Sequence, residues 1–210
     1  MRMEKKIYTH PYFGEMYYLL DVPEALKGQK KRPLLIFLHG AGERGKDHEL
    51  IAKNAVPRMI EEGLSLPCVT VCPQCPNGFV WHTEVHFLKD FIDHIIKEYD
   101  IDPSRVSLTG ISMGGYGTWE MIMDYPEMFR KAAPVCGGGT PWRAWQIKSK
   151  VWAFHGDADG AVPCIGSVQL VDAMKNAGGD ARLTLFHGCD HNSWDPAYET
   201  TKVLDWLTED

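Results

Sequence analysis

The chain has 210 residues, 44% of them hydrophobic and 24% charged, which is typical of one folded domain that spans residues 1–210. Its formal net charge of −6 disfavours a nucleic-acid surface, and no apolar run approaches the ~20 residues that cross a membrane. The N-terminal residues lack the apolar core of a signal peptide, so a cytoplasmic location is expected.

Apolar runs alternate along the chain with segments of helical periodicity. Strands are expected at Met16–Leu20, Leu34–Leu38, Cys68–Cys72, Arg105–Thr109, Ala132–Cys136, Val151–Phe154 and Arg182–Phe186. Helices are expected at Glu84–Tyr99, Ser112–Asp124, Ile165–Ala177 and Tyr198–Leu207. The middle strands are continuously apolar, as in a parallel sheet covered on both faces. The alternation predicts an α/β fold with a mostly parallel, doubly wound sheet flanked by helices.

The turn between the strand Arg105–Thr109 and the next helix carries the pattern G-x-S-x-G, from Gly110 to Gly114. A strand, this pattern and a helix form the context of a nucleophile elbow, a sharp turn that exposes a serine hydroxyl above a helix N-terminus. The pattern therefore predicts that Ser112 is a nucleophile.

Two polar segments downstream supply partners for this serine, which needs a base that is itself oriented by a carboxylate. The segments are His155–Pro163 and Gly188–Trp194, and each follows an expected strand. Because the carboxyl ends of parallel strands meet at one edge of a sheet, both segments should lie beside Ser112. Asp157 and Asp159 are both candidates for the carboxylate at this point.

The motifs together resemble a known superfamily. They are Leu38–Gly45, Thr109–Trp119, Val135–Gly139, the H-G-x-x-D-x-x-V-P segment from His155 to Pro163, and His191–Trp194. From about Tyr17 onward, the chain is similar to the predicted-peptidase and esterase branch of the α/β-hydrolases. Its relatives there are dienelactone hydrolases, acyl-protein thioesterases and single-domain feruloyl or polyhydroxybutyrate esterases.

The resemblance implies an α/β-hydrolase fold and assigns roles to residues. Ser112 would be the nucleophile, His191 the general base and then acid, and Asp159 the orienting carboxylate, because similar sequences have the acid four residues before the proline of the segment. The oxyanion hole would use the backbone amides of Ala41 and Met113. In this fold His39 is expected to support the oxyanion loop, and Asp157 to form a turn.

Substrate contacts are less sharply indicated. Arg44, in the glycine-rich loop after the strand Leu34–Leu38, is expected either to pair locally with Glu43 and stiffen the loop, or to bind a substrate carboxylate or sugar hydroxyl. Trp81, Trp142, Trp145 and Trp194 fall in expected loops near the site, and Trp81 and Trp194 are the candidates for lining its pocket.

About fifteen residues separate Cys136 from Val151, which allows a loop and a short helix but no cap domain. The site should therefore be open to bulky or polymer-attached substrates, which disfavours a true lipase. Cys72 and Cys75 form a lone C-x-x-C, so reduced, buried cysteines are expected rather than a zinc site, and no metal or other cofactor is implied.

The predicted function is a serine hydrolase that cleaves small-molecule or saccharide-linked carboxylic esters through an acyl-enzyme. The alternatives are a peptidase or thioesterase with the same triad, and an inactive binding module on the same scaffold. The intact serine, aspartate and histidine argue against the last of these.

Overall fold

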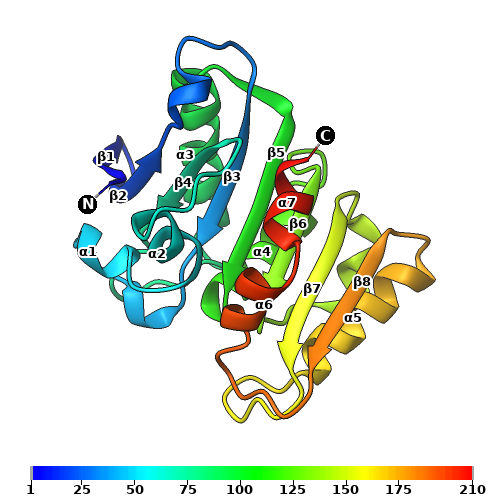
Figure 1. The fold of residues 1–210 in the computed structure, drawn as a ribbon. Helices are drawn as coiled ribbons and strands as arrows, with labels where there is room; N and C mark the ends of the chain where they lie inside the picture. The colour runs from blue at the N-terminus through cyan, green and yellow to red at the C-terminus, as the bar shows by residue number, and fades with distance from the viewer. Residues whose placement is uncertain (1, 210) are drawn as a thin grey trace.

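The computed structural model describes residues 2–209, which form a mixed sheet with helices on both faces (Figure 1). The strands are β1 (Glu4–His10), β2 (Gly14–Asp21), β3 (Arg32–Leu38), β4 (Val69–Pro73), β5 (Ile101–Ile111), β6 (Lys131–Val135), β7 (Lys150–Gly156) and β8 (Ala181–Phe186). Their order in the sheet is β1-β2-β4-β3-β5-β6-β7-β8. Strands β3 to β8 are parallel, whereas β2 runs antiparallel to both β1 and β4. The predicted α/β-hydrolase sheet is confirmed.

Two apolar clusters fill the space on the two faces of the sheet. The helices are α1 (His48–Ile51), α2 (Ala55–Glu61), α3 (Val85–Glu98), α4 (Met113–Asp124), α5 (Ile165–Asn176), α6 (Trp194–Thr200) and α7 (Val203–Thr208), with short 3-10 helices η1 (Glu24–Leu26), η2 (Ala41–Glu43) and η3 (Pro141–Gln146). One cluster contains side chains of α3, α4 and α5, and the other contains those of α2, α6 and α7. In Figure 1 the red helices α6 and α7 cross one face, while α3, α4 and α5 lie behind the sheet.

The chain order of the strands creates the place for a site. From β3 the chain goes to β4 on one side and then returns to β5 on the other side. Loops that leave β3 and β5 therefore diverge at their carboxyl ends, which is where open α/β sheets bind ligands. Ala41 follows β3 and Ser112 follows β5 at this point.

Some observed elements differ from those expected from the sequence. Strand β1 and the short helices α1 and α2 were not expected. Strand β1 lies at the edge of the sheet, and its side chains, several of them charged, alternate between exposed and half-buried. The expected helix Tyr198–Leu207 is wrong as one element, because Thr201 is extended between α6 and α7. The Thr201 hydroxyl donates to the Ala197 carbonyl (2.6 Å) and accepts from the Val203 amide (3.2 Å), so it competes with helical backbone bonds.

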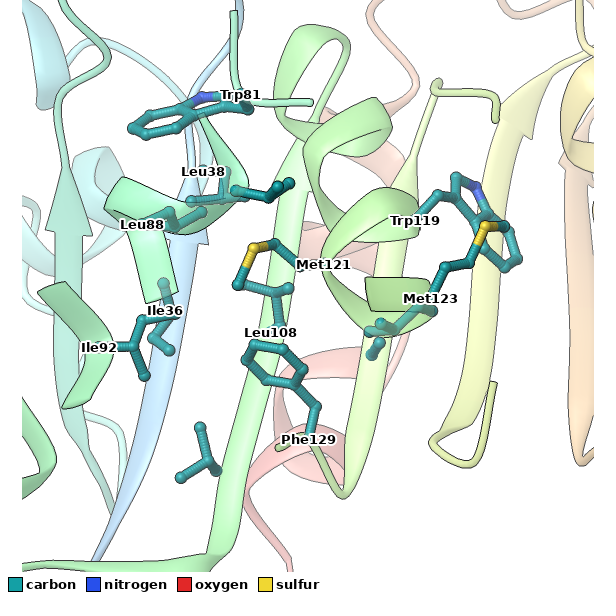
Figure 2. Packing of buried hydrophobic residues seen from close by; sticks show 14 of the residues in the cluster. Ile36, Leu38, Trp81, Leu88, Ile92, Leu108, Trp119, Met121, Met123 and Phe129 are labelled. Atoms are coloured by element: carbon teal, nitrogen blue, oxygen red, sulfur yellow. The ribbon is translucent and has the colours of Figure 1, made fainter. Parts of the chain in front are cut away.

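The placement of Trp81 also differs from the prediction that it lines the pocket. Its side chain is fully buried, with its Nε1 donating to the His39 carbonyl (3.0 Å). Figure 2 shows the Trp81 ring beside Leu38 in the cluster that also contains Leu88 of α3. An ideal Cβ on Gly117 of α4 would lie 2.4 Å from the Trp81 Cβ, so the ring is wedged against the helix that follows the elbow. Trp81 therefore has a packing role.

The connection between β6 and β7 contains η3 and no further helix within the described residues, in agreement with the expected absence of a cap domain. Arg143 ties η3 to α4 through Glu120 and Asp124, while Trp142 and Trp145 point outward with exposed fractions of 80% and 71%. Trp145 contributes to a groove with Pro126 and Lys148, which precede β6 and β7, so it lies toward the edge opposite the candidate site. Among the helices of residues 2–209, none is long and apolar enough to span a membrane.

Candidate active site

The turn at Ser112 has the strained geometry that the elbow pattern predicts. Ser112 has φ +52° and ψ −116°, a backbone conformation that residues other than glycine rarely adopt, and α4 begins at the next residue. Close packing enforces the turn, because an ideal Cβ on Gly114 would lie 2.0 Å from the Leu38 carbonyl oxygen. An ideal Cβ on Gly110 would lie 2.5 Å from the Gly114 carbonyl oxygen. Only glycine fits at either position.

The structure brings Ser112, His191 and Asp159 into one hydrogen-bonded chain. The Ser112 Oγ lies 2.9 Å from the His191 Nε2, and the His191 Nδ1 lies 2.8 Å from the Asp159 Oδ2. A carboxylate can only accept, so the proton of a neutral His191 belongs on Nδ1. The Nε2 lone pair then faces the serine hydroxyl, which is the arrangement that a general base needs.

The surroundings of Asp159 favour its ionised form. Burial opposes the charge, but hydrogen bonds from the Val162 amide (2.8 Å), from His191 and from the Ala161 amide (2.9 Å) outweigh it and hold the pKa of this carboxyl below its usual value. A buried, charged and fixed acceptor is therefore available to His191.

The neighbouring acids have other partners. Asp157 accepts from the Gly188 amide (2.7 Å) and lies 2.9 Å from the His187 Nδ1, which makes it a bridge between two loops. Asp190 accepts from the amides of Gly160 (3.1 Å) and His191 (2.8 Å). Asp157 therefore links two loops rather than forming the expected local turn, and Asp190 links the loop of His191 to Gly160.

His155 is a further contact of the carboxylate that the sequence did not indicate. It is fully buried, as expected, and its Nε2 lies 2.9 Å from the Val162 carbonyl and 3.2 Å from the Asp159 Oδ2. Both neighbours are acceptors, so this nitrogen carries a proton; it donates to the Val162 carbonyl and lies close to the Asp159 oxygen that His191 contacts. Its Nδ1 lies 2.8 Å from the Ser167 hydroxyl, and burial lowers the pKa of His155.

The loop after β3 lies against the elbow. An ideal Cβ on Gly40 would lie 3.7 Å from the Ser112 Cβ, an ordinary van der Waals distance, so the loop lies directly beside the serine. Ala41 and Ser112 line the same pocket. Met113 is the first residue of α4, so its amide has no helical carbonyl to bind. Both amides predicted to form an oxyanion hole are thus on segments that flank Ser112.

Side chains behind this loop fix its shape. His39 is buried, accepts from the Cys75 amide through Nε2 (2.9 Å) and lies 2.6 Å from the Gly40 carbonyl through Nδ1. Burial lowers the pKa of His39 to about 4, so it is neutral. Arg44 donates to the carbonyls of Ala41 (2.9 Å) and Phe79 (3.2 Å). Arg44 therefore braces this loop through backbone carbonyls rather than through the expected pairing with Glu43, and it does not line the pocket beside Ser112.

A pocket of about 220 Å³ opens beside the nucleophile. Its lining residues within the described chain are Gly40, Ala41, Gly42, Glu43, Asn54, Ile111, Ser112, His191 and Trp194, and they include neither Arg44 nor Trp81. The ring of Trp194 meets the His191 ring edge to face at 5.5 Å between centroids, which keeps Trp194 as a candidate substrate contact. Glu43 and Asn54 were not expected there, and no sequence motif marks Asn54.

The cysteines are all free, and four of the six are buried. Cys136 Sγ lies 3.3 Å from the Ser112 amide, and burial raises the pKa of its thiol to about 12, so it is a packing residue behind the elbow. Within residues 2–209 no cluster of three or more His, Cys, Asp or Glu side chains is arranged to hold a metal ion.

Comparisons with known proteins give relatives with the same fold. The pattern of the prolyl oligopeptidase family matches residues 83–154. Poly(3-hydroxyalkanoate) depolymerase C of Paucimonas lemoignei is 25% identical over 211 residues, which cover 93% of this chain and 48% of that protein. The chain thus spans about half the length of this relative.

Solved structures agree. A thermostable esterase is 36% identical with a TM-score of 0.88, covering 99% of this chain and 62% of that one. The feruloyl esterase module of Clostridium thermocellum, complexed with sinapinate, is 19% identical with a TM-score of 0.76, covering 99% and 87%. With this sheet and this elbow, the chain has the α/β-hydrolase fold and is similar to esterases of that fold.

Proposed function

We propose that this chain is a serine esterase that hydrolyses small carboxylic esters through an acyl-enzyme. The observation that carries the proposal is the continuous chain of hydrogen bonds from the Ser112 hydroxyl through His191 to Asp159, at the carboxyl edge of the sheet. The similarity to proteins named as esterases supports ester substrates.

In the proposed mechanism, the Ser112 Oγ attacks the ester carbonyl carbon while the His191 Nε2 accepts the hydroxyl proton. The amides of Ala41 and Met113 donate to the oxygen that becomes negative. As this intermediate collapses, the C–O bond to the alcohol breaks and His191 returns the proton to the leaving oxygen. A water molecule, deprotonated by His191, then attacks the acyl-enzyme; the acyl C–O bond to the Ser112 Oγ breaks, His191 returns the proton to this oxygen and the acid is released. Asp159 holds His191 in the required tautomer throughout.

A panel of p-nitrophenyl acyl esters, aryl-sugar esters and short peptides tests this function, with a fluorophosphonate probe that labels reactive serines. We expect ester turnover and labelling by the unmodified protein and neither by Ser112→Ala. The match to the prolyl oligopeptidase family favours a peptidase as the second candidate, so peptide cleavage without ester cleavage would replace the esterase proposal.

The shared triad predicts how two substitutions combine. Ser112→Ala and His191→Ala should each remove nearly all turnover, and the double variant should lose about as much as either one, because triad members act as a unit. Measured kcat values for the three variants, with melting temperatures to show folding, check this. Losses that multiply in the double variant would contradict a shared role.

A further inference from the structure

A carboxylate stands beside the nucleophile in the small pocket. Glu43 belongs to η2 in the loop after β3, is 8% exposed and lines the pocket together with Ser112 and His191. An ideal Cβ on Gly40 would lie 3.2 Å from the Glu43 Oε2 and 3.7 Å from the Ser112 Cβ. The carboxylate oxygen and the serine therefore flank the same point of the loop.

One oxygen of Glu43 is occupied and the other is available. Oε1 accepts from the Asn54 Nδ2 at 2.8 Å. Oε2 lies 3.9 Å from the His39 Nδ1, which is beyond hydrogen-bond distance, and that nitrogen already serves the Gly40 carbonyl. Within the described chain no hydrogen bond reaches Oε2, and no lysine or arginine forms an ion pair with Glu43. The Arg44 guanidinium is committed to the Ala41 and Phe79 carbonyls.

This arrangement creates an electrostatic conflict in the proposed reaction. Hydrolysis develops negative charge on the carbonyl oxygen near the amides of Ala41 and Met113, and the negative carboxylate of Glu43 in the same pocket repels this charge. Neutral His39 supplies no compensating charge. A hydrogen-bond donor on the substrate would resolve the conflict, because it would bind Oε2 and spread the carboxylate charge.

We propose that Glu43 determines specificity by accepting a hydrogen bond from a substrate hydroxyl close to the scissile ester. The proposal rests on the esterase function above and names its substrate class as small hydroxylated esters. Because the Glu43 Oε2 and Ser112 flank the same point of the loop in a pocket of about 220 Å³, the hydroxyl must lie close to the ester. The pocket admits such a group on the acyl or on the alcohol side.

Two matched substrate pairs test the proposal, and in each pair a hydroxyl replaces a methyl group of similar size. The acyl pair is p-nitrophenyl hydroxyacetate and p-nitrophenyl propionate. The alcohol pair is 2-hydroxyethyl acetate and propyl acetate. Each kcat/KM is divided by the rate of hydrolysis by hydroxide, so that intrinsic reactivity cancels.

The unmodified protein should prefer the hydroxylated member of at least one pair by about tenfold or more, since a polar site discriminates strongly against a partner without the matching group. Glu43→Gln should lower kcat/KM for that member and raise it for the methyl member. The Asn54 donor would hold the new amide oxygen, so an NH₂ group and no negative charge would face the pocket. Glu62→Gln, an exposed acid at the end of α2, is the control and should change neither ratio.

Opposite changes in kcat/KM for the hydroxylated and the methyl substrate would distinguish a role in specificity from a role in structural support. If Glu43 only stabilises the loop, Glu43→Gln lowers both members equally, and the proposal is wrong. The proposal is also wrong if, in both pairs, the unmodified protein hydrolyses the hydroxylated and the methyl member with equal normalised kcat/KM. This measurement does not depend on whether the variant folds. Fluorophosphonate labelling of Ser112 reports the esterase function separately, so a labelled protein without hydroxyl preference rejects only the specificity proposal.

Discussion

At the scale of single residues, identical side chains take different roles because their surroundings differ. Asp157 and Asp159 are two positions apart, yet Asp159 is buried against His191 while Asp157 lies in a more exposed bridge to Gly188 and His187. The Ala161 and Val162 amides lock the Asp159 carboxylate from one side, and His155 approaches it from another. Position in the hydrogen-bond network, rather than residue type, distinguishes the aspartate that contacts His191.

Substituting each aspartate tests this distinction. Asp159→Asn should lower kcat by up to roughly 10⁴-fold, because an amide that donates to the His191 Nδ1 would favour the wrong tautomer. Asp157→Asn should lower it by less than about tenfold, because Asp157 does not contact His191. Steady-state kinetics on one p-nitrophenyl ester, with circular dichroism as a folding control, compare the two variants. A larger loss of kcat in Asp157→Asn than in Asp159→Asn would show that Asp159 is not the orienting acid.

His39 makes a second residue-scale prediction, on stability in acid. Burial lowers its pKa from 6.5 to about 4. Between these pH values His39 is protonated in the unfolded chain but neutral in the folded chain, so the free energy of unfolding falls as the pH drops from 6.5 to 4. The contribution is about 3 kcal/mol at most. His39→Gln, which keeps an acceptor for the Cys75 amide, should flatten this part of the pH profile.

Urea unfolding at several pH values between 4 and 7 measures the effect. The exposed His82→Gln serves as the matched control and should keep the slope of the unmodified protein. His155, whose pKa burial also lowers, is unchanged in both variants and contributes equally to both profiles. An unflattened profile for His39→Gln would show that His39 is protonated in the folded protein.

At the scale of elements, the site depends on how closely β3 and β5 meet the start of α4. The Gly114 backbone lies against the Leu38 and His39 carbonyls, and Gly115 lies against the Val135 carbonyl at the end of β6. These contacts leave no room for side chains, so the helix can begin directly at Met113 with Ser112 in its strained conformation. The glycines thus convert three adjacent strand ends into one rigid platform.

A single methyl group should disrupt this platform. Gly114→Ala would place a Cβ 2.0 Å from a backbone oxygen that cannot move aside without shifting β3. We expect the free energy of unfolding to fall by roughly 3 kcal/mol or more, with loss of activity. Gly160→Ala, where nothing lies within 4 Å of the added Cβ, should change stability by less than about 1 kcal/mol. Thermal unfolding of both variants checks the comparison, and equal stabilities would contradict the packing argument.

At the scale of the whole molecule, the described residues leave the carboxyl edge of the sheet uncovered. The segment between β6 and β7 forms only η3, whose tie to α4 holds it against the body of the protein. The site therefore consists of a small pocket beside Ser112 that opens directly to solvent. A large alcohol group can remain outside the pocket while the ester bond reaches the serine.

Acyl-chain length should reveal this openness. Each methylene added within the pocket can gain up to about 0.8 kcal/mol by burial, but those beyond it stay in water and gain little. We therefore expect kcat/KM for p-nitrophenyl esters to level off at short chains. Trp194→Ala, which removes a wall of the pocket, should weaken aryl or sugar esters more than acetyl esters. A steady rise to long chains with a neutral Trp194→Ala would contradict the open-pocket description.

Seven of the eight strands of the described residues, the helices α3, α4 and α5 and the segments that hold Ser112, Asp159 and His191 could be predicted from the sequence, whereas β1, α1 and α2 could not. Apolar periodicity and the glycine spacing around Ser112 are local properties, so they are readable from neighbouring residues. The folded structure was needed to show which further residues join the predicted Ser112 and His191 in the pocket and which do not. Asn54 reaches Glu43 from another loop, and Trp81 packs in the core against Gly117 with its Nε1 donating to the His39 carbonyl. Such contacts depend on how the loops after different strands meet at the edge of the sheet, and no pattern of neighbouring residues in the sequence predicts them.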